Sequence, residues 1–333
     1  MIKQIASILL LTMLLSACSE QSEQQKTLAQ GHAEIIALNK LLHVQAQDST
    51  KLYWPFSEQY LAARHTIYQD LKDQQLTQQQ MAQLNYLIIA ERFPERFLPW
   101  PRQVNVISNA KQVTETGDEA LNNWLQFVHH KLIEAEQSNL RLNRLEVNQL
   151  RGYLLAFKQF DSLPAVSVLD NYLQSYKPRP TLGLMALSNG KEWYQSKLNY
   201  FTAKTQSPLQ WLAQLQSLMT EYSGDVAIVI DEKRSHSSPF ILDFLTASEG
   251  ELGFDWQLNY LEPHQSKRQL TKAEQYFWLV MMETDLGIHY HSWTTQQAQF
   301  NLMKRLGLTE QKANWLIKDI VFYPAMSFLF ITQ

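Results

Sequence analysis

The sequence predicts an all-α protein, a multi-helix single domain with at most one short strand-like segment. Its 333 residues include only 10 glycines and 11 prolines, a balance that disfavours a turn-rich β-sandwich. Apolar residues recur at helical spacing through most of the chain, and several stretches carry the Ser/Thr-x-x-Glu/Gln signature of a helix start. A chain of this length suits one large domain or two modest ones.

The first 17 residues have the pattern of a secretory signal peptide. Lys3 supplies a positive start, and residues 8–15 form an apolar stretch too short to span a bilayer. The tetrapeptide Leu15-Ser16-Ala17-Cys18 resembles a bacterial lipobox, in which cleavage precedes the cysteine and the cysteine is acylated. The resemblance therefore implies a signal peptide over residues 1–17 and a lipid anchor on Cys18.

The residue after the cysteine bears on location. In bacterial lipoproteins, an Asp after the cysteine indicates retention at the inner membrane, and here Ser19 occupies that position. By analogy with those lipoproteins, the protein is predicted to lie on the periplasmic side of a Gram-negative outer membrane. Several acyl chains, at about 0.8 kcal/mol per buried methylene, hold a protein there effectively permanently. Residues 18–30 are predicted to be the acylated cysteine and a polar tether, followed by a helical domain over 31–333. The alternative is an uncleaved helix with a buried cysteine.

The first half of the domain alternates helices with short connectors. The cluster Tyr53-Trp54-Pro55-Phe56 is predicted to pack on the core, since an aromatic group beside a proline usually does. Thr77 opens a capping box with Gln80, and either Asp161 or Ser162 is expected to cap a later helix. The predicted helices are 28–47, 57–73, 77 to just before Pro94, 119–138, 139–160 and a short one ending near Tyr176.

A Pro/Arg segment at residues 177–181 divides the domain into possible lobes, 31–176 and 181–333. Residues 225–231 are the one run that reads as a strand. Phe328 to Ile331 are expected in the core, because exposing them would leave an apolar patch. The second half has predicted helices at 191–202, 209–221, 275–286, 295–306 and 310–322. The predicted caps are Ser207, Thr271, Thr294 with Thr295, and Thr309, and Gly307 is expected to end the helix before it.

Composition excludes several functions. The net charge is −3 with no basic block, so nucleic-acid binding has no electrostatic basis. The single cysteine is assigned to lipid, which leaves no internal disulfide and no cysteine nucleophile. No His-Glu-x-x-His, Gly-x-Ser-x-Gly, phosphate-binding or dinucleotide-binding motif is present.

The segment from Thr284 to Thr294 concentrates the groups that are able to do chemistry. Asp285 and His289 are four residues apart, and His291 lies on the same side as His289 if that segment is extended. Carboxylate and imidazole suit zinc or another divalent metal. The preceding helix is expected to end at Gly287. The competing, and favoured, interpretation is purely structural. In it, a hydrogen bond between a histidine and Asp285 fixes the corner between the two helices that this segment joins.

Two segments of the second half resemble one bacterial family. Residues 176–194 read Tyr-Lys-Pro-Arg-Pro-Thr-Leu-Gly-Leu-Met-Ala-Leu-Ser-Asn-Gly-Lys-Glu-Trp-Tyr, similar to a Pro/Arg segment followed by Gly-Leu and Leu-Pro-x-Gly-x-x-Tyr-Tyr. Residues 285–298 read Asp-x-Gly-Ile-His-x-x-x-Trp-Thr-x-x-Gln-Ala, with Tyr323-Pro324 beyond. Both are similar to motifs of the helical zinc-peptidase-like proteins called domain-of-unknown-function family 885. The resemblance singles out Asp285, Gly287, His289, His291, Trp293 and Tyr323 as one corner of a cleft, with Asn189, Gly190 and Tyr194 as weaker candidates.

Departures from that family concern its chemistry. Its His-Glu-x-x-Pro-Gly-His motif is missing, and the corresponding interval holds only His236 and Pro239. Glu249 is a weak candidate for a former metal ligand, in a remnant of the family's Glu-Gly-Trp-Ala-Leu-Tyr segment. Met326 stands where the family has Gln and Phe330 where it has Tyr. The whole chain also resembles the lipoproteins of domain-of-unknown-function family 3080, which carries no assigned function.

These observations predict a membrane-anchored periplasmic lipoprotein, a non-catalytic relative of helical zinc peptidases that binds a peptide, an envelope fragment or a protein partner. No cofactor is expected. The alternative is a metal-dependent hydrolase or peptidase with a non-standard site at Asp285, His289 and His291, and only this alternative would use zinc.

Overall fold

The structure is a computed structural model that describes residues 26–39, 41, 53–92, 117–155, 163–202, 204–221 and 270–331. Within these ranges every named regular element is a helix, which confirms the all-α prediction. The predicted signal peptide, Cys18 and the strand-like run 225–231 lie outside the described residues. No helix in the described part of the chain is both long and apolar enough to cross a membrane.

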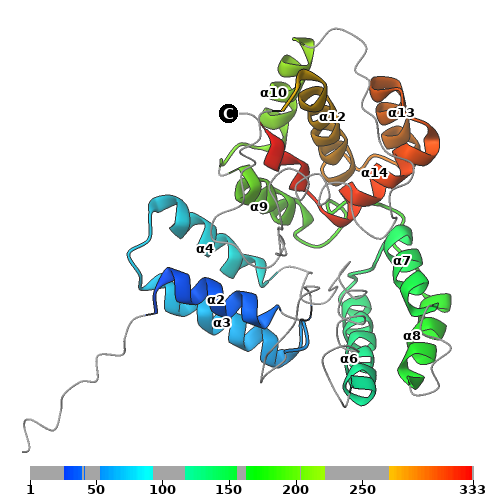
Figure 1. The fold of residues 1–333 in the computed structure, drawn as a ribbon. Helices are drawn as coiled ribbons and strands as arrows, with labels where there is room; N and C mark the ends of the chain where they lie inside the picture. Colours follow the sequence, from blue (N-terminus) through cyan, green and yellow to red (C-terminus); the bar gives the residue numbers. More distant parts are fainter. Residues whose placement is uncertain are drawn as a thin grey trace, which may run out of the picture.

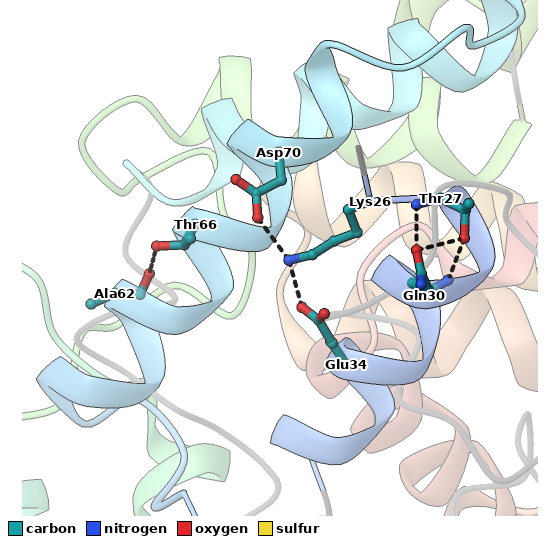
Figure 2. Close-up of polar contacts among 7 residues, drawn as sticks. All are labelled: Lys26, Thr27, Gln30, Glu34, Ala62, Thr66 and Asp70. Carbon is teal, nitrogen blue, oxygen red and sulfur yellow. Dashed lines mark hydrogen bonds and ion pairs between the residues drawn. The ribbon is translucent and has the colours of Figure 1, made fainter. Parts of the chain in front are cut away.

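The first group of helices lies together at the N-terminal side of the fold (Figure 1). It consists of α2 (Leu28–Leu38), α3 (Glu58–Lys72) and α4 (Gln78–Ala90). Lys26, just before α2, places its ammonium 2.7 Å from a carboxylate oxygen of Glu34 and 2.7 Å from one of Asp70 (Figure 2). Since Asp70 belongs to α3, this lysine joins the first two helices where the chain enters the fold.

The second group consists of α6 (Gly117–Gln137), α7 (Arg144–Leu155) and α8 (Pro164–Ser175), which lie together in Figure 1. The Trp124 ring of α6 stacks on Trp54 at 5.8 Å, and its Nε1–H donates to the Pro55 carbonyl at 3.2 Å. Together with buried Phe56, these contacts confirm that the predicted aromatic cluster packs on the core. The expected cap of α8 is wrong, because Leu163 occupies that position and Pro164, which has no N–H to satisfy, follows it.

The third group consists of α9 (Gly190–Thr202), α10 (Pro208–Thr220), α12 (Lys272–His289), α13 (Thr295–Leu306), α14 (Glu310–Phe322) and the short 3-10 helix η3 (Met326–Phe330). In Figure 1 these elements surround α12, whose residues from Phe277 to His289 are all buried. The Trp278 ring stacks on Phe330 at 3.8 Å, and Trp211 meets Phe328 edge-on at 5.5 Å. The chain end therefore packs into the core as predicted.

Residues 177–190, which we call the strap, connect the second group to the third. The Arg179 guanidinium donates to the carbonyls of Arg141 and Leu182 and to the Glu146 carboxylate, each at 3.0 Å. Further along, the Met185 N–H donates to the His289 carbonyl at 3.2 Å. The strap thus runs from the start of α7 to the C-terminal end of α12.

Side-chain caps define most helix boundaries in the way that the sequence indicates. Thr77, Ser207, Thr271, Thr294 and Thr309 each accept a hydrogen bond from the third helical N–H, as predicted. Gly307 closes α13 in the left-handed conformation at φ 64°, which glycine adopts without strain.

Candidate functional site

The candidate site is the C-terminal end of α12, and this helix is longer than the sequence suggests. The expected end at Gly287 is wrong, because α12 continues to His289 and Tyr290 caps it. Gly287 serves close packing instead. A Cβ at this position would lie 2.2 Å from the Trp293 ring, and the Gly287 carbonyl accepts a 2.8 Å bond from the Trp293 N–H. The tryptophan therefore covers the last turn of α12.

Asp285 lies at the centre of a buried polar cluster. Its Oδ1 accepts a 2.6 Å hydrogen bond from the Tyr194 hydroxyl, and its Oδ2 accepts one of 3.2 Å from Ser327. The Ala325 N–H lies 3.1 Å from Oδ1 and 3.0 Å from Oδ2. The carboxylate is fully buried, so it joins α12 to α9 and to the chain around η3 without contacting solvent.

The Ala325 donor depends on an unusual backbone conformation. Ala325 has φ 64°, a region that an alanine enters only at a cost of about 1 kcal/mol or more. This conformation follows α14 and turns the N–H of Ala325 onto both oxygens of Asp285. A charge-assisted bond to a buried carboxylate offsets that strain, because such bonds are roughly twice as strong as neutral ones.

His289, one turn after Asp285, is also fully buried. Its Nε2 lies 2.9 Å from the Ile320 carbonyl in α14, which requires the proton on Nε2 in the neutral ring. The Tyr194 ring stacks on the imidazole at 5.4 Å with an interplanar angle of 28°. The remaining nitrogen, Nδ1, is buried and has no hydrogen-bond partner among the described residues.

Burial dominates the electrostatics of the cluster. It raises the pKa of Asp285 to about 7, although hydrogen bonds from Tyr194, Ala325 and Ser327 and the charge of Lys197 act in the opposite direction. Burial also lowers the pKa of His289 to about 3, so the imidazole is neutral at physiological pH. The pKa of Tyr194 is raised well above its usual range by burial and by the adjacent carboxylate.

Two parts of the cluster were not predicted from the sequence. Lys197 lies one turn after Tyr194 on α9, is only 2% exposed, and has its ammonium 5.5 Å from the centre of the Trp193 ring. Helical spacing from Tyr194 is the one signal that points to it. Ser327 and the Ala325 N–H reach Asp285 from 40 or more residues away, and no local pattern marks such contacts.

The predicted site residues are only partly brought together. Tyr194, a weak candidate, contacts both Asp285 and His289. His291 does not join them, because it is exposed and lies past the helix end. The extended segment that would have placed His291 beside His289 is not formed, since α12 continues through His289. Buried Tyr323 caps the C-terminus of α14.

Two of the other weak candidates, Asn189 and Gly190, lie at the start of α9. Asn189 has φ 56°, and a Cβ on Gly190 would lie 1.8 Å from the Leu184 carbonyl, so both residues shape the turn that starts α9. His236 and Glu249 lie outside the described residues.

The cluster as it stands holds helices together. Asp285 already accepts bonds on both oxygens, and the imidazole Nε2–H is engaged by a backbone carbonyl. Among the described residues, no three or more His, Cys, Asp or Glu side chains group closely enough to hold a metal ion.

Comparisons with known proteins give no relatives on which to draw. No family model, no curated protein and no solved structure matches this chain.

Proposed function

We propose that the protein is a lipid-anchored protein of the bacterial envelope that acts by binding a peptide, an envelope fragment or a protein partner, with the α12 corner serving the fold. The observation that supports a structural role for this corner is the burial of Asp285 and His289, both with no exposed surface. A substrate must reach the groups that act on it, and here those groups face one another and the helices around them.

The lipobox-like Leu15-Ser16-Ala17-Cys18 supports the anchor. Its expected position at the periplasmic side of an outer membrane remains part of the proposal, as does membership of the lipoproteins of domain-of-unknown-function family 3080.

The resemblance to helical zinc-peptidase-like proteins gains support from one backbone detail. The corresponding motif of that family is Tyr-x-x-x-Pro-Gly-Gln-Ala-Leu-Ser-Tyr. Its glycine follows the proline that corresponds to Pro324, and in this chain Ala325 occupies that position. Ala325 has φ 64°, the region that glycine favours. A distant relative that kept the backbone turn while losing catalytic residues would have this arrangement.

The anchor is tested by Cys18→Ser in a Gram-negative host. We expect the wild type in the outer-membrane fraction, with a mass increase on the N-terminal peptide that matches acylation. The variant should leave that fraction. A wild-type chain that is recovered unacylated from the soluble periplasm would refute the anchor.

The rival hydrolase is tested separately with purified full-length protein. It needs His291 to approach His289, yet one histidine is exposed and the other is sealed in the core. We expect His291→Ala to leave zinc content and stability unchanged. One zinc per chain that disappears in His291→Ala would favour the hydrolase and count against a non-catalytic role.

A further inference from the structure

Helix α13 has a second apolar face that points to solvent. Phe300 is 66% exposed and Met303, one turn later, is 39% exposed. The opposite face of the helix supplies Ala298, Leu302 and Leu306 to the core, where α13 packs on α12 and α14. The outer residues are therefore not needed for the packing of this helix.

The outer face is held rigidly in place. A capping box at Thr294 and the left-handed Gly307 fix the two ends of α13. On its flank, Arg305 pairs with Glu283 of α12 at 2.9 Å, and Asn301 donates to Glu283 at 3.1 Å. A preformed helix face loses little conformational entropy when it binds, and that favours its use as a docking surface.

The charged residue on the outer face of α13 is a lysine, Lys304. The Lys304 ammonium lies 5.5 Å from the centre of the Phe300 ring, and no ion pair to this lysine occurs within the part of the chain that the structure describes. Arg305, by contrast, forms an ion pair with Glu283. The face formed by Phe300, Met303 and Lys304, which we call the α13 face, thus combines an aromatic anchor with a cation that has no counter-charge among the described residues.

The position of α13 argues against the anchoring membrane as the occupant. Lys26 comes eight positions after Cys18, so the chain between them spans at most about 28 Å. In Figure 1, α13 lies on the opposite side of the molecule from the start of α2. A domain of this length has a radius of gyration of about 20 Å, and a compact sphere of that size is about 50 Å across, which is more than the tether spans. Turning α13 toward the bilayer would therefore carry Lys26 beyond the reach of the tether.

A second copy of the chain fits the α13 face poorly. In a two-fold contact through this face, both copies would bring Lys304 to the same interface, where like charges repel. A complementary surface needs an apolar group to cover Phe300 and Met303 and a carboxylate to pair with Lys304.

We propose that the α13 face binds a protein partner that presents an apolar side chain next to a carboxylate, as an acidic amphipathic helix does. This inference deepens the proposed binding function and rests on it. It assigns the partner to the side of the molecule that faces away from the lipid anchor.

The test uses the full lipidated chain in nanodiscs and two synthetic fluorescent peptides. Both peptides are amphipathic helices with leucines at i, i+3 and i+7, and they differ in carrying either glutamates or lysines beside the leucines. By fluorescence anisotropy we expect the glutamate peptide to bind at least tenfold more tightly. Phe300→Ala should weaken its binding tenfold or more, and Lys304→Glu should reverse the preference between the peptides.

Leu209→Ala is the matched control, because Leu209 is 55% exposed on α10. It should change binding less than twofold. Equal binding of both peptides, no binding at millimolar peptide, or an equal loss in Leu209→Ala would overturn the proposal.

Two further results would assign a different occupant. The Cys18→Ser chain binding phosphatidylethanolamine and phosphatidylglycerol vesicles in a Phe300-dependent way would indicate a lipid surface, and Phe300-dependent dimers in sedimentation would indicate a second copy. Failure of the anchor shows in the membrane fractionation of Cys18→Ser, whereas failure of the α13 face shows in the peptide-binding assay, so the two failures can be told apart.

Discussion

The Tyr194 hydroxyl donates a 2.6 Å hydrogen bond to Oδ1 of Asp285, a residue 91 positions later in the chain. The same tyrosine ring stacks on His289. One side chain of α9 thus holds both titratable groups at the end of α12, and the strap contacts the last turn of α12. The polar residues that first suggested chemistry are the ones that fasten the helices of the third group.

Tyr194→Phe isolates this hydrogen bond, since the ring and its stacking remain. We expect the free energy of unfolding in urea to fall by about 1–3 kcal/mol, because a buried carboxylate loses a donor. Tyr290→Phe is the control, since its ring is partly exposed and it should change the stability by less than about 0.5 kcal/mol. Equal losses in the two variants would deny Tyr194 this role.

Asp285 makes stability depend on pH. Its pKa in the folded state, about 7, lies above the ordinary value of 3.8, so the folded protein binds the proton more tightly. The resulting stabilisation is fully present below pH 4 and is lost as the pH rises through about 7, a change on the order of 4 kcal/mol.

The variant Asp285→Asn removes this titration. We expect wild-type stability, measured by urea unfolding at pH 5, 6, 7 and 8, to fall more steeply with pH than that of the variant. Burial also raises the pKa of Glu146, so the difference between the two proteins is the informative quantity. Parallel curves would mean that Asp285 does not titrate in this range.

The glycine near the end of α12 and the glycine in the strap differ in how well they tolerate a larger side chain. A Cβ on Gly183 would lie 1.9 Å from the Ile288 carbonyl, which is backbone, whereas one on Gly287 would meet the Trp293 side chain. We expect Gly183→Ala to be the more destabilising in thermal unfolding and Gly287→Ala to cost about 1–3 kcal/mol.

Gly152 provides the matched control, because a Cβ there would meet nothing within 4 Å. Gly152→Ala lies within α7 and should stabilise the protein by about 0.5–1 kcal/mol. Losses of similar size at all three glycines would show that packing at the strap is not the cause.

Lys26 ties α2 to α3, as Figure 2 shows. We expect Lys26→Met to speed hydrogen exchange in the first turns of α2 while exchange in α12 is unchanged. The effect on global stability should stay below about 1 kcal/mol, since the ion pairs are partly exposed. Unchanged exchange in α2 would show that its apolar contacts alone hold it.

Helix starts were predictable because their signals are local. Thr271 lies three residues before Glu274, and that spacing specifies a capping box whatever the tertiary structure. The end of α12 was not predictable in this way. A glycine such as Gly287 is common both at a helix end and at a point of close packing. Which of the two applies here depends on where Trp293 packs.

The segment that contains the candidate site could be predicted from the sequence, but the residues that contact it in the folded protein could not. Asp285 and His289 lie on one helix, so their proximity follows from helical spacing. Their partners Ser327 and Lys197 belong to distant elements, and their contacts depend on how those elements pack. Extended geometry would have placed His291 beside His289, but α12 continues through His289 and leaves His291 exposed.

The most direct test of a structural corner is thermal unfolding of the wild type and His289→Ala, each with and without saturating zinc. We expect His289→Ala to lower the melting temperature by several degrees, because it removes a buried ring and leaves the Ile320 carbonyl without its donor. Zinc should shift neither protein. A wild type that zinc stabilises, by about 2.7 kcal/mol at 100 times its Kd, beside an equally stable variant that does not respond, would contradict the account.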